Sequence, residues 1–543
     1  MKLENKFRSF FVEILKKHLT FPNGPNNCAR KGLFPLYFDP WGVSMKPDFI
    51  SHHDYRLTVL DRLKKYYAPP AAILVRADWP LIFKCLITDL SATTTLLADT
   101  YSDKGPKPRD PASMLRSYLL FLLTRPEIGI TEWVNELYRY PLYAILSGFE
   151  PGDIPGVGTF YDFLARFWDS DRKHLGPTVR PRRSKPKKGK KGEKAPTTSA
   201  GKIERLVRRV LKYGLGSKAQ PMDRLFAFFQ SQFLAVSAKY GLLGDPGAMD
   251  VAGDGTPVQT ASWSRSKPTC DCHARGLAKC NHPRDFSQPD CNSGWDSSRE
   301  KYYNGYHLYM LTAANSKHDL PLYPRLQPAS RHDATSFVVS SVEFAQRFTL
   351  GMVDKMLLDA AHDATAIYHL LKRQGIKPFI DLNKRTTKYL DTDTDMKISP
   401  EGVPVCPVGK EMKPYGYDNT RDRQKWICPM MKGRTTNTCP TPCSDAKFGR
   451  TYHTCGEDHP RLFSAVARSS EQWKTVYKRR TSVERSNKRE KVDYKLEAGR
   501  HRSTMMWYIR IYGIMMCQHI DAWFVENRET LEAMREDILP AAK

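Results

Sequence analysis

Residues 477–491 read Tyr-Lys-Arg-Arg-Thr-Ser-Val-Glu-Arg-Ser-Asn-Lys-Arg-Glu-Lys, and this stretch does most to decide the fold. An α-helix turns by ~100° per residue, so Tyr477, Arg480, Glu484 and Lys491 fall on one face about 60° wide. A charged stripe is usually a solvated helix surface. This one suits a phosphodiester, because Glu484 can hold a metal ion, Arg480 and Lys491 can bind phosphate oxygens, and Tyr477 can position them. We therefore expect a helix with a functional face here.

Upstream of this helix, short β-like runs alternate with helical patterns, which is typical of an α/β domain. The expected strands are 249–254, 305–313, 321–327, 352–358 and 378–380, and the expected helices between them are 333–347 and 363–374. Helices are also expected at 203–211, 223–240, 471–489 and 504–526. From about residue 389 to residue 470 the regular pattern gives way to a loop-rich segment that contains cysteines.

Two aspartates stand where strands of this domain are expected to end. Asp254 closes the run Met-Asp-Val-Ala-Gly-Asp, and Gly255 is expected to let the backbone turn so that the carboxylate points outward. Asp359 ends the apolar run Met-Leu-Leu-Asp. Strand ends are where sites form in open α/β sheets, although acidic residues there are more often structural or solvated.

Two nearby acids compete for these roles. Asp250 is set aside because it lies inside the first β-like run rather than at its end. Asp363 is set aside because it is expected to cap the N-terminus of the following helix.

The net charge of +27 indicates a polyanionic partner, and nucleic acid is the commonest one. An anionic membrane surface is the alternative, but no apolar run is long enough to span a bilayer. Nine Lys or Arg residues between Arg180 and Lys194 form a basic linker that cannot bury enough apolar surface to fold alone. Most of the charge therefore lies in the folded parts. The basic charge and the lack of an export signal favour reduced cysteines and a cytoplasmic location.

The first 175 residues are expected to be mainly helical. Helical spacing of apolar residues runs from Pro111 to Thr124 and again from Glu132 to Leu146. A third helix is expected to begin at Thr159, after the Pro155-Gly156 break. In a basic protein these helices suggest a small DNA-binding bundle; an ordinary helical core without DNA contact is equally compatible with the pattern.

The spacing Tyr-x2-Arg-x3-Glu-x6-Lys, spelled by Tyr477, Arg480, Glu484 and Lys491, resembles the Y-R-E-K signature of bacterial insertion-sequence DDE transposases. Other segments of the chain resemble parts of that family in the same order. They are Asp254-Gly-Thr, Gly305-Tyr-His-Leu-Tyr-Met, Pro328-Ala-Ser-Arg-His-Asp, Leu358-Asp-Ala-Ala-His-Asp and Asp381-Leu-Asn-Lys-Arg. The resemblance covers about residues 245–390 and 470–530, with a fainter echo at 110–168. The long gap between Asp359 and Glu484 leaves room for an inserted subdomain, as family members have.

The resemblance implies a ribonuclease-H-like α/β catalytic core with an inserted cysteine-bearing subdomain, preceded by an all-α N-terminal region. It implies that Asp254, Asp359 and Glu484 hold two Mg²⁺ or Mn²⁺ ions, which suit hard carboxylate ligands. Arg480 and Lys491 would grip phosphates, with Tyr477 beside them. The partners would be double-stranded DNA, both element ends and target, and a second copy of the chain in synapsis. Two alternatives stay open: an inactive, transposase-derived DNA-binding regulator and a nuclease of the same fold.

The cysteines form two groups with enough ligands for structural zinc, though neither has paired CxxC spacing. The first group comprises Cys270, Cys272, His273, Cys280, His282 and Cys291. The second comprises Cys406, Cys428, Cys439, Cys443 and Cys455, with His453. Free thiols packed in loops are the alternative for both groups.

These features divide the chain into six expected segments. They are a helical region at 1–175, a basic linker at 176–202, connecting helices at 203–244, the first part of the catalytic domain at 245–390, the insertion at 391–470, and the motif helix with the C-terminal helix at 471–543.

Overall fold

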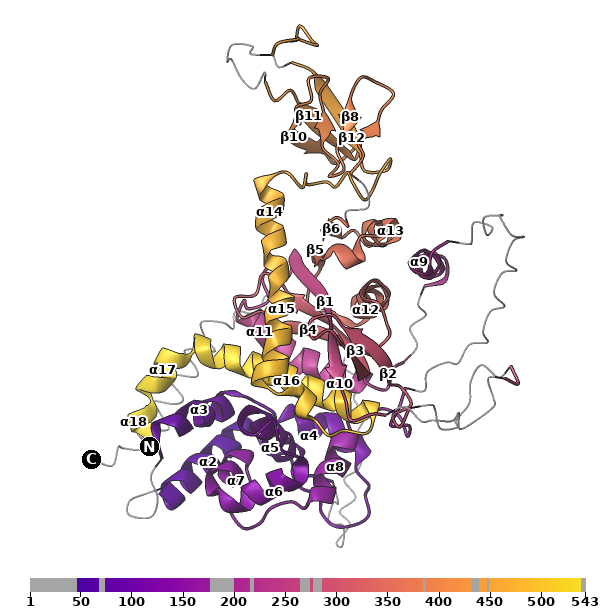
Figure 1. Ribbon diagram of the computed structural model, residues 1–543. Helices are drawn as coiled ribbons and strands as arrows, with labels where there is room; N and C mark the ends of the chain where they lie inside the picture. The colour runs from indigo at the N-terminus through magenta and orange to yellow at the C-terminus, as the bar shows by residue number, and fades with distance from the viewer. Residues whose placement is uncertain are drawn as a thin grey trace, which may run out of the picture.

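The computed structural model describes residues 46–67, 74–175, 200–214, 219–263, 274–276, 286–383, 387–430, 439–446 and 449–538. N-terminal helices lie at one end of the molecule, a mixed sheet with its helices lies in the middle, and a small β subdomain lies at the other end (Figure 1). Most of the basic linker and five members of the first cysteine group (all but Cys291) fall outside the described residues.

Seven α-helices are described in the N-terminal region, which confirms its helical character. They are α2 His52–Tyr67, α3 Trp79–Ile87, α4 Ala92–Leu97, α5 Pro111–Thr124, α6 Ile130–Arg139, α7 Pro141–Ser147 and α8 Val157–Ala165. Asp110 caps α5 by accepting hydrogen bonds from the backbone N–H groups of Ala112 and Ser113. The single helix expected from Glu132 was wrong, because Pro141 ends α6 and starts α7. The third helix begins at Val157 rather than at Thr159.

The central sheet has six strands and mixed directions. They are β1 Met249–Gln259, β2 Asn292–Asp296, β3 Lys301–Ala313, β4 Pro321–Pro328, β5 Val353–Leu358 and β6 Lys377–Ile380. The order is β2-β3-β1-β5-β6, and β4 also pairs with β3. Strand β1 is antiparallel to β3 and parallel to β5, and β5 is parallel to β6. The expected α/β alternation is therefore present.

Helices from three parts of the chain pack beside the sheet. They are α9 Lys202–Tyr213, α10 Asp223–Phe229 continued by α11 Ala235–Lys239, α12 Asp333–Arg347 and α13 Thr365–Arg373. Helix α9 lies against α12 and α13 and buries Val207 and Val210. Helix α12 has the bounds expected from the sequence.

The insertion is loop-rich, as its sequence predicts, but it also contains short strands that the sequence pattern did not indicate. It holds two three-stranded antiparallel sheets made of β7 Leu390–Asp391, β8 Lys397–Ile398, β9 Pro404–Val405, β10 Lys413–Asp418, β11 Arg423–Ile427 and β12 Thr451–Cys455. Trp426 lies in a small core of its own with Met396, Val403 and Met412, and its Nε1 donates to the Thr454 hydroxyl.

The helix after the insertion runs from it down to the rest of the molecule (Figure 1). It comprises α14 Glu471–Tyr477, a 3₁₀ turn Lys478–Arg480, α15 Thr481–Lys488 and a π turn Arg489–Asp493. Stacking of Trp473 on Phe379 of β6 and on Tyr477 fixes α14 against the edge of the sheet. The short helices α17 Arg528–Ala533 and α18 Arg535–Ile538 end the described chain.

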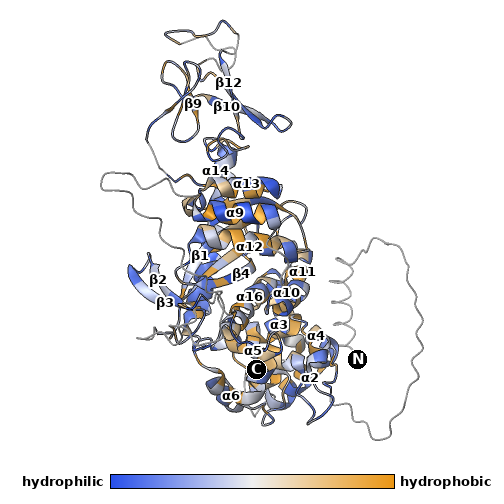
Figure 2. Ribbon diagram, turned by 90° about the vertical axis from the view of Figure 1, so that its right-hand side faces the viewer, coloured by the Kyte–Doolittle hydropathy of each residue, from blue (hydrophilic) through white to orange (hydrophobic). Residues whose placement is uncertain are grey.

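Helix α16, Thr504–Glu526, is buried over most of its length and has the bounds expected from the sequence. It packs against α3, α5 and α8 on one side and against α10 and β4 on the other. Hydrophobic residues concentrate where these helices meet (Figure 2). One continuous hydrophobic core therefore joins the N-terminal helices to the sheet, because an apolar helix without a polar face must be covered on all sides.

Among the described helices, none is by itself long and apolar enough to cross a membrane; one bent pair, Arg76–Ile87 with Ala92–Thr100, passes by length and composition.

Glu490 gives a test of the packing between the motif helix and α16. Its side chain is buried against Gln518, and burial raises its pKa to about 8 from an ordinary value of 4.5. The folded protein therefore keeps a proton that the unfolded chain loses, so this group's contribution to stability falls as pH rises from about 4.5 to 8. We expect Glu490→Gln to remove that fall, so that wild type loses up to about 1.4 kcal/mol per pH unit relative to the variant. Urea unfolding between pH 4.5 and pH 9 measures this.

The exposed Glu529→Gln is the matched control and should follow the wild-type profile. Parallel profiles for wild type and Glu490→Gln would show that Glu490 is ionised in the folded protein.

Candidate active site

Asp254 lies within β1, opposite Met310 of β3. The expectation that it closes the strand was wrong, since β1 continues to Gln259. The parallel pairing of β1 with β5, however, ends at Ala252 and Leu357. Asp254 therefore stands just beyond the point where β5 ends, and Asp359 follows β5 at the same level. The two aspartates meet at the carboxyl end of the parallel pair, where sites form in such sheets.

Gly255 does not make the turn expected of it. It sits in the extended strand, and a Cβ atom built on it would lie 1.9 Å from Asp333 Oδ1 and 2.3 Å from His307 Nε2. Gly253 is similarly covered by the hydroxyl of Tyr309, 2.7 Å from its Cβ position. The glycines on either side of Asp254 are thus required because side chains press directly against the strand.

Asp359 caps a 3₁₀ turn, Ala360–His362, and accepts a hydrogen bond from the backbone N–H of Ala361 at 3.1 Å. The Nδ1 of the buried His362 lies 2.5 Å from Asp359 Oδ1, and its Nε2 lies 2.9 Å from the Tyr309 hydroxyl. Burial opposes the charge on Asp359, but the hydrogen bond and charge of His362 outweigh it, and the pKa of Asp359 is lowered. His362 therefore holds this carboxylate ionised and oriented.

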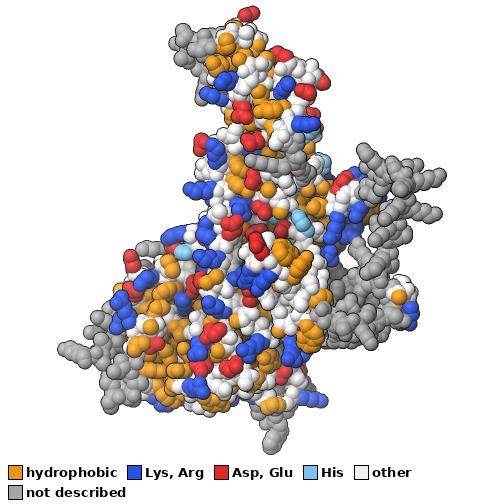
Figure 3. Space-filling model, viewed as in Figure 1, with side chains coloured by type: hydrophobic (Ala, Val, Ile, Leu, Met, Phe, Trp, Pro, Cys, Tyr) orange, Lys and Arg blue, Asp and Glu red, His pale blue; other side chains and the backbone are white. Residues whose placement is uncertain are grey.

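Asp254 has the opposite electrostatic environment. Burial, followed by the negative charges of Asp333 and Asp359, raises the pKa of Asp254 to about 7. Carboxylates that repel one another at short range favour either a shared proton or a bound cation. Figure 3 shows acidic side chains gathered midway along the molecule, with Lys and Arg side chains around them.

Asp333 and His307 belong to this cluster, and neither was assigned a role from the sequence. Asp333 opens α12, and its Oδ1 lies 2.9 Å from Nε2 of His307 on β3. Burial opposes the charge on Asp333, but contact with His307 leaves the pKa of Asp333 lowered. The signal in the sequence was the segment Ser-Arg-His-Asp333, whose resemblance to the family points to the start of this helix but not to the acid itself.

The motif helix brings Arg480 and Glu484 to the same region. Arg480 Nη2 contacts Glu484 Oε1 at 2.6 Å. The Arg480 guanidinium also packs over the ring of Tyr477, with its Cζ 5.9 Å from the ring centroid. The positive charge of Arg480 also interacts electrostatically with the carboxylates of Asp254 and Asp359. Burial raises the pKa of Tyr477 to about 12, so the phenol stays neutral. Tyr477, Arg480 and Glu484 are thus neighbours, as their spacing predicts.

Lys491 lies in the π turn beyond α15, and its side chain contacts residues other than those around Arg480. A common face for all four residues stays a prediction. Lys491 Nζ is 3.6 Å from Glu497, which also pairs with Arg299 beside β2 and β3. Burial lowers the pKa of Lys491.

The two competing aspartates are both occupied in other contacts. Asp250 is fully buried and paired with Lys355 and Arg479. Asp363 is paired with Arg461 and does not cap α13, whose N-cap is Ala364, so the expected reason for setting it aside was wrong.

In the described parts of the chain, no three His, Cys, Asp or Glu side chains close around one point as metal ligands do. Asp254 and Asp359 nevertheless fit a divalent cation, because they are hard oxygen donors whose mutual repulsion a cation would relieve. Glu484 is half exposed and held by Arg480.

In the insertion, Cys428 and Cys455 lie near opposite ends of the β11–β12 pair, and Cys406 packs in the small core. Zinc there stays a prediction.

Gly255 gives a test of the site's packing. Gly255→Ala must push Asp333 and His307 aside, and overpacking of this kind typically costs about 1–3 kcal/mol. We expect the free energy of unfolding, measured with urea, to fall by that amount. Gly158→Ala, which meets open space at the surface of α8, is the control and should change stability little. Equal stability of Gly255→Ala and wild type would contradict the close approach.

Comparison with known families agrees with this geometry. Residues 254–518 match the family model described as the transposase DDE domain. No curated protein matches the chain. A DDE domain implies a ribonuclease-H-like α/β core, and the mixed sheet with β1 parallel to β5 and antiparallel to β3 agrees with it. The segment from Asp254 to Gln518 is therefore similar to a transposase DDE domain, whose core is of the ribonuclease-H-like type.

Proposed function

We propose that the chain is an insertion-sequence DNA transposase that cuts DNA at the ends of its element and joins the freed 3′-hydroxyls to target DNA. The observation that carries this proposal is the convergence of Asp254, Asp359 and the Arg480–Glu484 pair within a transposase DDE domain. The fold alone would not be enough to assign this activity, since proteins with the same fold have different functions that depend on the residues of the site.

The DDE transposase family generally uses divalent metal ions, and two Mg²⁺ or Mn²⁺ ions are proposed here. Asp254, Asp359 and Glu484 would hold them. Bound ions would activate the attacking oxygen and stabilise the leaving 3′-oxygen. Asp254 must lose its proton to serve as a ligand, and the ordinary cytoplasmic pH is close to its pKa of about 7. His362 keeps Asp359 ionised and fixes its direction.

Arg480 has two available partners, Glu484 and a phosphate. In the protein without DNA it holds Glu484 at 2.6 Å. A phosphodiester entering the site would compete for the guanidinium, since Arg binds phosphate and carboxylate through the same planar set of donors. Exchange of Glu484 for phosphate would free the carboxylate to complete the site. Tyr477 packs beside Arg480 and limits its range of positions, while Lys491 would contact phosphates farther along the strand.

The proposed partners are double-stranded DNA, comprising the terminal inverted repeats and the target, and a second copy of the chain that pairs the two ends. The net charge of +27 supports a long DNA footprint. The reaction would take place in the cytoplasm.

The carboxylates provide the test. We expect Asp254→Asn, Asp359→Asn and Glu484→Gln each to reduce cleavage and strand transfer by on the order of a thousand-fold or more, because each removes a charge needed in the transition state. DNA affinity should stay near that of wild type. The measurement is excision and reintegration of a marker flanked by the gene's native borders, with gel-shift binding in parallel.

Glu471→Gln, an exposed acid on α14, is the matched control and should leave transposition unchanged. A wild type that binds DNA but neither cleaves nor mobilises it would favour a regulator. Cleavage without dependence on the element's borders would favour a general nuclease. Full activity in any one carboxylate variant would remove that residue from the site.

A further inference from the structure

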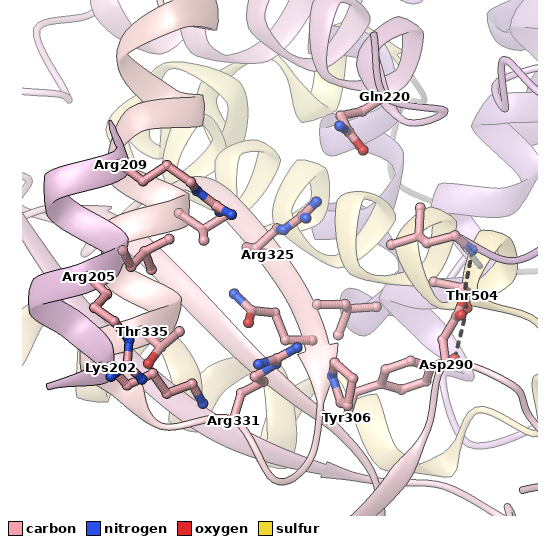
Figure 4. Close-up of a pocket in the computed structure, with 16 residues that line it drawn as sticks. Lys202, Arg205, Arg209, Gln220, Asp290, Tyr306, Arg325, Arg331, Thr335 and Thr504 are labelled. Atoms are coloured by element: carbon pink, nitrogen blue, oxygen red, sulfur yellow. Dashed lines mark hydrogen bonds between the residues drawn. The ribbon is translucent and has the colours of Figure 1, made fainter. Parts of the chain in front are cut away.

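A cavity lies between α9, β4 and the start of α12 (Figure 4). Its volume is about 870 Å³, which falls within the range of ligand-binding pockets. It contains none of the residues proposed for catalysis.

The walls of this cavity, named here the α9 pocket, carry five cationic side chains. Lys202, Arg205 and Arg209 come from one face of α9, Arg325 comes from β4, and Arg331 comes from the turn before α12. Figure 4 shows these side chains projecting from separate elements around a common space. The single acid in the lining, Asp290, lies at the far end, where it accepts hydrogen bonds from Leu175 N and the Thr504 hydroxyl.

Three of these cations are not neutralised. Within the described residues, the side chains of Lys202, Arg209 and Arg331 take part in neither an ion pair nor a hydrogen bond, whereas many other basic side chains of the protein are paired. Burial and the nearby charge of Arg331 lower the pKa of Lys202. Like charges held together without an anion destabilise the folded state, so a bound anion would relieve the repulsion.

An independent feature also indicates a missing hydrogen-bond acceptor. Gln327 lines the pocket and is only 9% exposed, yet its Nε2 finds no acceptor in the described part of the protein. A buried donor without a partner costs about 1–3 kcal/mol. An oxygen-rich anion such as a phosphate would satisfy Gln327 and the cations together.

We propose that the α9 pocket binds a phosphate of a DNA strand, as a DNA-binding subsite separate from the carboxylate site. The two sites are joined by the segment 328–335, which comprises the turn before α12 and the first residues of α12. Arg331 of the turn and Thr335 of α12 line the pocket, while Asp333 between them contacts His307 beside Asp254. A DNA strand that passes through the carboxylate site can therefore reach the pocket by crossing this segment. The choice of DNA as the source of the phosphate rests on the proposed function.

The test compares two charge-matched double variants of α9 in the full chain. Lys202→Gln with Arg209→Gln removes two pocket cations. Arg208→Gln with Lys212→Gln removes two exposed cations of the same helix that do not line the pocket. Affinity for a duplex that carries the element's end is measured by fluorescence anisotropy without divalent metal, over a range of salt concentrations.

We expect the pocket variant to weaken binding by about 10-fold at moderate salt and to reduce the slope of log Kd against log [NaCl] by about 1, as the loss of one phosphate contact requires. The control variant should change the affinity by less than about 2-fold. Arg331→Gln, on a different element, should weaken binding in the same direction, which guards against a local defect in α9. Equal losses in the pocket and control variants would overturn the proposal.

A free phosphate compound is the competing source of the ligand. Inorganic pyrophosphate is therefore tested by its effect on the melting temperature of wild type and of the pocket variant. Stabilisation of wild type alone, with DNA affinity unchanged in the pocket variant, would overturn the assignment to DNA. If wild type binds DNA through the pocket but never cleaves it, the proposed catalytic function is wrong and the phosphate subsite is supported. If wild type cleaves DNA normally and the pocket variant keeps the wild-type salt slope, the phosphate subsite is wrong and the catalytic function is supported.

Discussion

The buried guanidinium of Arg510 in α16 is the contact on which the arrangement of the protein depends. Its Nε donates to Leu496 O at 3.0 Å, and its Nη2 donates to Pro126 O at 2.7 Å and to Lys495 O at 2.8 Å. One side chain thus joins the N-terminal helices, the segment after the motif helix, and the helix that carries it. A buried charge is tolerated only with such partners. Since α16 is buried on nearly all sides, the N-terminal helices and the sheet share one core, and the catalytic helix is anchored to both.

Catalytic geometry follows from this anchoring. The sheet delivers Asp254 and Asp359 where the β1–β5 pairing ends, and the helix tied to α16 brings Arg480 and Glu484 alongside. The aspartates differ in protonation because their neighbours differ: His362 supports the charge on Asp359, whereas Asp333 and Asp359 oppose the charge on Asp254. Such opposed environments are characteristic of functional sites rather than of structural ion pairs. The fully paired Asp250 and Asp363 show the structural kind.

Long periodic elements could be predicted from the sequence, and features that depend on tertiary contacts could not. Helices α5, α12 and α16 have the expected bounds because their apolar spacing is regular. The motif placed Tyr477, Arg480 and Glu484 together, because three residues within two turns tolerate small distortions. The π turn Arg489–Asp493 has no recognisable sequence signal, so the contact of Lys491 with Glu497 could not be predicted. Asp254 was placed at a strand end because Gly255 beside it was interpreted as a turn, whereas close contact with Asp333 and His307 requires this glycine within the strand. The α9 pocket combines distant segments, which periodicity does not reveal.

If Asp254 and Asp359 hold divalent metal, the protein alone should bind it without DNA. Electron paramagnetic resonance of Mn²⁺ titrated with protein measures the free ion. We expect wild type and the exposed control Asp61→Asn to reduce the free Mn²⁺ signal equally, and Asp254→Asn and Asp359→Asn each to weaken this binding by about tenfold or more, since each removes a charged ligand. Binding by Asp254→Asn and Asp359→Asn equal to that of wild type would contradict the assignment of these two aspartates as metal ligands.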